Sequence, residues 1–107
     1  MSAGPQFSVT VSIPVGHEGS DGAATKIAAV DPSKAYPPGF TVSGDSTTVA
    51  AGVAVRTFTV TVSPSTELHS IVENAVQAAA LIHDMTLPYF CKQIPVTNAT
   101  CEVVKVP

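Results

Sequence analysis

The residues best suited to acid or base chemistry lie in a glycine-rich segment near the start of the sequence. His17 and Glu18 are adjacent there, and Asp21 follows within the same glycine-rich run. An imidazole beside carboxylates can exchange protons near neutral pH, and flanking glycines let a ligand approach the backbone. However, no phosphate-loop pattern with a lysine follows, and the sequence has no nucleophile-elbow motif. A solvated loop is therefore the preferred interpretation, and we expect no catalytic residue and no enzyme activity.

Two further histidines fall in a segment with helical periodicity. His69 and His83 are 14 residues apart, which is about 21 Å along a helix, so they cannot hold one ligand together. His69 lies one turn before Glu73, and His83 precedes Asp84; both pairs fit solvated or dipole-complementing roles. The sequence contains no CxxC, HExxH or EF-hand spacing. It therefore predicts no metal site and no cofactor.

The two cysteines, Cys91 and Cys101, raise the question of a disulfide. They lie in segments 88–94 and 100–106, whose composition predicts a closing pair of strands. A hairpin centred on Val96 places the cysteines directly opposite each other, at a separation that a disulfide can span. Synthesis in a reducing cytosol favours two buried thiols instead. Both alternatives stay open: a disulfide between Cys91 and Cys101, or two reduced side chains.

Aromatic and apolar positions outside the predicted core are candidates for contact with another subunit. Tyr36 and Phe40 flank a stiff proline turn, which loses little entropy on docking. The two aromatics fit an apolar knob on a neighbour, and they fit equally well a lid folded over one open end of the sheet. Leu81 falls on the otherwise polar side of the predicted helix, as a single exposed leucine or as a subunit contact. The interface candidates are Tyr36, Pro37, Pro38, Phe40 and Leu81.

The elements that must carry these residues begin with a regular strand. Residues 7–13 alternate apolar and hydroxyl side chains, which predicts a half-buried antiparallel strand. Long loops at about 14–25 and 31–39 flank a short apolar strand predicted at 26–30. Both loops exceed the usual length of a connection in a compact domain, and loops of that kind are usually functional or disordered.

The middle of the sequence predicts strands with an irregularity. Residues 40–42 predict a brief strand, 43–46 a turn, and 47–62 the longest β segment. Within that segment the apolar side chains change from odd to even positions, and a strand changes face only at a bulge or a bend. We expect a break at 52–56 that divides the segment into two strands, which contribute to different parts of the sheet.

A helix start follows the last of these strands. Ser63 and Pro64 suit the capping and first helical positions, and the apolar spacing predicts one long amphipathic helix over about 64–84. The predicted apolar stripe comprises Leu68, Ile71, Val72, Ala75, Val76, Ala79 and Ile82. The element order gives a single α+β domain over residues 1–107: a mostly antiparallel β-sheet or small β-sandwich, with the helix packed across it and a C-terminal β-hairpin.

Composition and charge exclude several classes of function. The chain has 107 residues, enough for one domain, and 8 acidic against 5 basic side chains give a formal charge of −3. Scattered bases provide no positive field for a phosphate backbone, so we expect no direct nucleic-acid partner. The first residues lack the basic and apolar regions of a signal peptide, and no apolar stretch reaches membrane-spanning length. We therefore expect synthesis in the cytoplasm without a signal peptide, and no membrane partner.

The types of apolar residue in the sequence favour assembly of several subunits. The sequence is rich in Val, Ala, Thr and Ser and poor in Leu, so each core residue contributes modest transfer free energy. A thin core with little surface charge suggests help from neighbouring subunits, and we expect a homo-oligomer or a larger protein assembly.

These expectations define three functional hypotheses. The preferred one is a structural self-assembling subunit, specifically a small virion component such as a capsid, decoration (cement) or tail-tube protein of a phage-like particle, located in the virion. The alternatives are a small-molecule-binding or enzymatic α+β domain with a pocket between helix and sheet, and a protein-binding adaptor or inhibitor.

Overall fold

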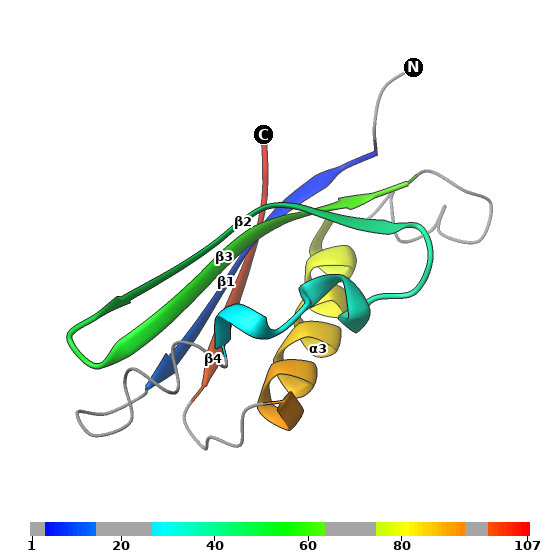
Figure 1. The fold of residues 1–107 in the computed structure, drawn as a ribbon. Coiled ribbons are helices and arrows are strands. Elements are labelled where there is room, and N and C mark those ends of the chain that lie inside the picture. The colour runs from blue at the N-terminus through cyan, green and yellow to red at the C-terminus, as the bar shows by residue number, and fades with distance from the viewer. Residues whose placement is uncertain (1–3, 15–26, 64–74, 94–98) are drawn as a thin grey trace.

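The alternating N-terminal segment forms strand β1 (Gln6–Pro14), with its apolar side chains buried and its hydroxyl side chains half-buried. The structure, a computed structural model, describes residues 4–14, 27–63, 75–93 and 99–107. Its other elements are η1 (Pro32–Ala35), β2 (Phe40–Ala50), β3 (Val53–Val62), α3 (Ala75–Gln93) and β4 (Thr100–Lys105). Together they confirm the α+β class: an antiparallel sheet packs against one long helix (Figure 1).

The sheet has the strand order β2-β3-β1-β4, and each neighbouring pair is antiparallel. β1 therefore lies in the interior of the sheet. Its Val9 faces Phe58 of β3 on one side and Val103 of β4 on the other. The first and last strands are neighbours, and the amide of Val106 donates to the carbonyl of Gln6 at 2.8 Å.

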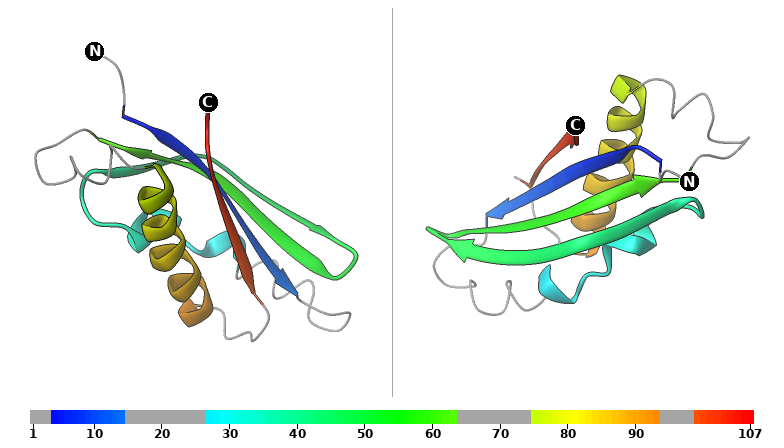
Figure 2. Two further views of the ribbon diagram at one scale, coloured as in Figure 1. Left: turned by 180° about the vertical axis from the view of Figure 1, so that it is seen from behind. Right: turned by 90° about the horizontal axis from the view of Figure 1, so that it is seen from above.

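One face of the sheet forms the core, and α3 lies across it (Figure 2). The apolar sheet side chains buried on this face are Phe7, Val9, Val11, Ile13, Phe40, Ala54, Phe58, Val60 and Val62. Phe90 of α3 stacks on Phe58, with the ring centroids 6.2 Å apart. Two buried rings therefore fill the space between helix and sheet.

The helix continues to Gln93, so the predicted end at Asp84 is wrong; the predicted start lies outside the described residues. The buried stripe recurs every four residues and comprises Ala78, Ile82, Thr86 and Phe90. Val76, expected in the apolar stripe, is instead 80% exposed. Pro88 lies inside the helix on its exposed side. Phe90 is buried one turn beyond Thr86, and its burial offsets the backbone hydrogen bond that the proline removes.

The predicted C-terminal hairpin is therefore also wrong. Its first strand, expected at 88–94, belongs to α3 as far as Gln93. Its second strand is confirmed as β4, but β4 pairs with β1. Consequently Cys101 lies opposite Val11 in the sheet, and the register that would place it opposite Cys91 does not exist.

The β2–β3 hairpin corrects the expected pattern in the middle of the chain. β2 runs unbroken through the brief strand and the turn expected at 40–46, with a bulge between Ser43 and Ser46. The break expected at 52–56 is the tight turn at Ala51 and Gly52, whose φ angles of 53° and 75° suit a two-residue hairpin. The two strands are direct neighbours in the sheet, so their expected separation into different parts is also wrong.

Arg56 accounts for the apparent change of phase. β3 buries its even positions throughout, and Arg56, only 3% exposed, occupies one of them. Its guanidinium pairs with Asp45 in the bulge of β2 and donates to the carbonyls of Ile27 and Val30. The strand expected at 26–30 is wrong, because residues 27–29 form a helical turn. The buried guanidinium satisfies carbonyls that a strand would have paired with another strand.

The proline-rich connection at 31–39 contains a short 3-10 helix, η1. Asp31 caps it by accepting hydrogen bonds from the Ser33 amide at 3.1 Å and the Ser33 hydroxyl at 2.7 Å, which hold the pKa of Asp31 below its ordinary value. Pro32 occupies the first helical position, where no amide is needed. Apart from Pro14, the other long loop, expected at 14–25, lies outside the described residues.

Candidate functional site

The proline-flanking aromatics fold into the core. Tyr36 and Phe40 are both buried, and their rings stack with centroids 5.9 Å apart. Pro37 and Pro38 between them are exposed. Of the two alternatives for the aromatics, the geometry matches the lid over the sheet, and it leaves only the two prolines available to a neighbour.

A buried hydrogen-bond chain fixes this lid to the helix. The hydroxyl of Thr86 donates to the carbonyl of Ile82 at 2.6 Å, so the phenol of Tyr36, 2.5 Å from Thr86 Oγ1, is the donor in that second bond. Burial raises the pKa of Tyr36 to about 12. The phenol is therefore a structural group that stays neutral, and it has no role as a base near neutral pH.

Leu81 is not a free apolar contact. Its side chain is half-buried and packs against the hydrophobic core. The buried stripe follows Ala78, Ile82 and Thr86, so Leu81 lies at the border of this stripe and not on the polar side where the sequence pattern placed it.

The cysteines are free thiols on different elements. Cys91 lies on α3 and Cys101 on β4, and both are half-buried. Burial raises the pKa of the Cys101 thiol to about 11, so little reactive thiolate forms there at neutral pH.

Of the three histidines, the described part of the chain includes His83. His83 Nδ1 lies 3.4 Å from the carboxylate of Asp84, and both side chains are open to solvent. His17, Glu18, Asp21, His69 and Glu73 lie outside the described residues. Within the described ranges, no group of three or more His, Cys, Asp or Glu side chains could hold a metal ion. No helix in that part of the chain is long and apolar enough to cross a membrane.

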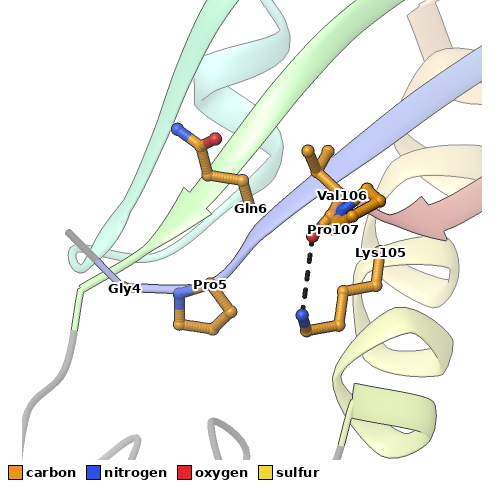
Figure 3. Close-up of a pocket in the computed structure, with 6 residues that line it drawn as sticks. All are labelled: Gly4, Pro5, Gln6, Lys105, Val106 and Pro107. Atoms are coloured by element: carbon orange, nitrogen blue, oxygen red, sulfur yellow. Dashed lines mark hydrogen bonds between the residues drawn. The ribbon is translucent and has the colours of Figure 1, made fainter. Parts of the chain in front are cut away.

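An open hollow in the described part of the chain lies beside the start of β1 and the end of β4, away from the contact between helix and sheet. Figure 3 shows its lining: Gly4, Pro5, Gln6, Lys105, Val106 and Pro107. Lys105 has the one charged side chain in this set, and its Nζ is 3.5 Å from the carbonyl of Val106. Two prolines, a glycine and a valine with one amide and one lysine side chain do not provide the converging polar groups of a small-molecule site.

The feature that sequence reasoning missed is the uncovered face of the sheet. Among the described elements, none packs on the side opposite α3 (Figure 2). We call this side the hydroxyl face, because in the strand register its positions are mostly Ser and Thr. The hydroxyl residues are Thr41, Ser43, Ser46 and Thr48 of β2, Thr57, Thr59 and Thr61 of β3, Ser8, Thr10 and Ser12 of β1, and Thr100 of β4.

The hydroxyl side chains form rows across the strands. Ser46, Thr57 and Thr10 stand side by side from β2 to β1, and the row ends at Glu102 of β4. Glu102 is the one charged residue at the paired positions of this face. The alternation of Ser8, Thr10 and Ser12 with buried residues was the available sequence signal; the shared face of all four strands required the register.

Comparisons with protein-family models, with curated proteins and with solved structures found no match for this chain.

Proposed function

We propose that this chain is a structural subunit that self-assembles, specifically a small virion component such as a capsid, decoration or tail-tube protein of a phage-like particle. The observation that carries the proposal is the end of the β2–β3 hairpin, which extends beyond the cover of α3 (Figure 1). Val49 lies there opposite Ala54, on the side of the sheet that elsewhere forms the core, yet it is 41% exposed.

The chemistry of this hairpin end supports a protein contact. From Ser46 to Val55 the sequence has no charged residue and no proline. Soluble proteins usually protect an edge strand, such as β2 of this hairpin, with charges, prolines or covering elements. An uncharged, β-branched hairpin end is a surface that a neighbouring subunit can cover at little desolvation cost.

The overall shape supports the same proposal. The principal extents are 47 × 23 × 21 Å and the radius of gyration is 14.3 Å, whereas a globular chain of this length has a radius of about 13 Å. Among the described elements, α3 covers only part of the sheet (Figure 1), so an apolar side chain such as Val49 stays exposed. Contacts with neighbours would supply the missing burial.

Size-exclusion chromatography with light scattering, over a wide range of protein concentration, tests the proposal. We expect the wild-type chain to be oligomeric, and electron microscopy of concentrated samples to show regular particles. Val49→Glu should reduce the assembled mass. Ala80→Glu, at an exposed position of α3, is the matched control and should leave the mass unchanged. A wild-type chain that is monomeric at every concentration contradicts the proposal.

A further inference from the structure

We infer that the hydroxyl face is a contact between two copies of this chain, which pack sheet against sheet about a two-fold axis. The inference rests on the proposed function, because it assigns one of the contacts through which the subunit assembles. It concerns the other side of the sheet from Val49: the hydroxyl face and the Val49 contact share the hairpin segment 46–55, but the hydroxyl face lies opposite the core.

The charge distribution argues against a face that is only solvated. Solvent-exposed surfaces usually carry about a quarter to a third charged residues, yet Glu102 is the one charge at the paired positions of this face, and it lies on edge strand β4. The charged side chains of the strands themselves lie elsewhere: Arg56 and Lys105 occupy positions of the opposite face, and Asp45 lies in the bulge of β2. The centre of the hydroxyl face is therefore free of charge.

The chemistry of the face selects a second copy as the occupant. Each Ser or Thr hydroxyl both donates and accepts a hydrogen bond, so a hydroxyl-rich surface is complementary to itself. A face without a basic residue has nothing to attract a nucleic acid, and its paired positions offer no aromatic ring on which a base or sugar could stack. Two-fold pairing brings identical uncharged centres together without like-charge repulsion.

Apolar side chains on the same face supply burial. Val53 and Val55 of β3 are half-buried, and Val104 of β4 is 52% exposed, opposite Ser8. These valines flank the hydroxyl rows, so a second sheet laid over the face would cover both kinds of group. Apolar contacts then contribute affinity, and paired hydroxyls set the register.

The available area is sufficient for a specific contact. Four strands at about 4.8 Å spacing and nine residues at about 3.4 Å rise give a face of roughly 590 Å² per copy. Two such faces bury about 1,200 Å² in total, at the lower limit for specific interfaces. We therefore expect a reversible dimer contact, which the hairpin contact supplements in the larger assembly.

Lysine substitutions at the centre of the face test the inference. Thr10 and Thr57 are directly paired neighbours on the two interior strands, and the Thr10→Lys/Thr57→Lys chain places like charges at the centre of both copies. We expect its dissociation constant for dimer formation to rise at least tenfold in light-scattering measurements. Ala80→Lys on exposed α3 is the matched control. Circular dichroism spectra and thermal unfolding establish whether each variant is folded.

Cysteine cross-linking provides a second readout that does not depend on disrupting the face. In a Cys91→Ser/Cys101→Ser background, Thr10→Cys or Thr57→Cys should form a disulfide between two copies under mild oxidation. If the lysine variant fails to fold, this result decides: cross-linked dimers support the inference, and their absence from both cysteine variants overturns it. If the introduced cysteine, in an assembled particle, forms a disulfide only with a different protein, then the face contacts that protein. This result also overturns the inference.

The outcomes separate this inference from the proposed function. A folded lysine variant that assembles as strongly as the wild type overturns the two-fold contact, while the assembling role stands. A wild-type chain that is monomeric at every protein concentration contradicts both the two-fold contact and the assembling role. Loss of assembly in Val49→Glu, with cross-linking retained at Thr57→Cys, supports both contacts as independent.

Discussion

Arg56 and Asp45 form an ion pair across the bulge of β2. Arg56 Nη2 lies 2.5 Å from Asp45 Oδ2, and Nε lies 2.5 Å from Oδ1. The same guanidinium donates to the carbonyls of Ile27 and Val30. One buried cation therefore joins β3, the bulge of β2 and the segment that precedes η1.

Removing the carboxylate from this pair should destabilise the fold. Asp45→Ala leaves the buried Arg56 without its counter-ion, and we expect the free energy of unfolding to fall by about 2 kcal/mol, since charged hydrogen bonds contribute about 1.5–3 kcal/mol each. Urea unfolding followed by circular dichroism measures the change. Ser46→Ala, an exposed neighbour in the same strand, should cost less than about 0.5 kcal/mol. Equal losses in the two variants would show that the pair has no special role.

Removing the donor or the acceptor of the Tyr36–Thr86 hydrogen bond should lower the free energy of unfolding by different amounts. Tyr36→Phe removes the donor but leaves Thr86 bonded to the Ile82 carbonyl, so we expect a loss of about 1 kcal/mol. Thr86→Val leaves the phenol without an acceptor in a buried position, and the loss should be about 2 kcal/mol. Chemical unfolding of both variants measures the order, and a larger loss for Tyr36→Phe contradicts the assigned donor.

Stability should fall in alkaline solution because of the same tyrosine. The folded pKa of Tyr36 is about 12 against an ordinary value of 10.0, so the fold favours the neutral phenol. This stabilisation is complete below pH 10 and is lost as the pH rises toward 12, by about 2 kcal/mol. Unfolding measured along this pH range should show a shallower decline for Tyr36→Phe than for the wild type. The Cys101→Ser variant separates the similar effect of the Cys101 thiol, which is lost from pH 9 toward 11.

Because residues 88–93 are helical, substitutions of Pro88 and Phe90 should change the free energy of unfolding in opposite directions. Pro88→Ala restores an amide inside α3, so we expect the free energy of unfolding to rise by about 1–3 kcal/mol. Phe90→Ala opens a cavity beside Phe58 and should lower it by about 4 kcal/mol. Thermal and denaturant unfolding measure both. No gain from Pro88→Ala, together with a minor loss from Phe90→Ala, would instead favour the surface hairpin predicted from the sequence.

The two thiols should remain reduced in the purified protein. Alkylation after unfolding without reductant should modify both Cys91 and Cys101, because each is free on a separate element. Mass spectrometry counts the added groups. In the folded protein, Cys101 should react slowly, since burial holds its pKa near 11. An unmodified pair in the unreduced, unfolded sample would demonstrate a disulfide.

The sequence predicts the local elements whose side-chain periodicity agrees with their final environment. The alternation in 7–13 correctly predicts β1, because one side of that strand is buried along its whole length. The order of the predicted strands and helix correctly indicates the α+β class, and the sequence of residues 100–106 correctly predicts a strand. These features depend on the local pattern of apolar and polar side chains, and that pattern agrees with the burial of the same residues in the fold.

The errors arise where a distant contact decides the local structure. Residues 88–93 contain a proline and aromatic residues typical of strands, but Phe90 packs on Phe58, which is distant in the sequence. Arg56 looks like a break in an apolar phase until Asp45 and the carbonyls of Ile27 and Val30 surround it. The hydroxyl face likewise depends on the strand order, which alternation within single strands does not specify.

The pairing of β1 with β4 constrains the time course of folding. Among the described strands, β1 is synthesised before both of its neighbours in the sheet, β3 and β4. Contacts between such distant segments form slowly, because a long loop must close before they stabilise anything. Until residues 100–105 have left the ribosome, one edge of the apolar β1 strand has no partner. Nascent chains are therefore most prone to aggregate in this interval, and rapid capture of β4 protects them.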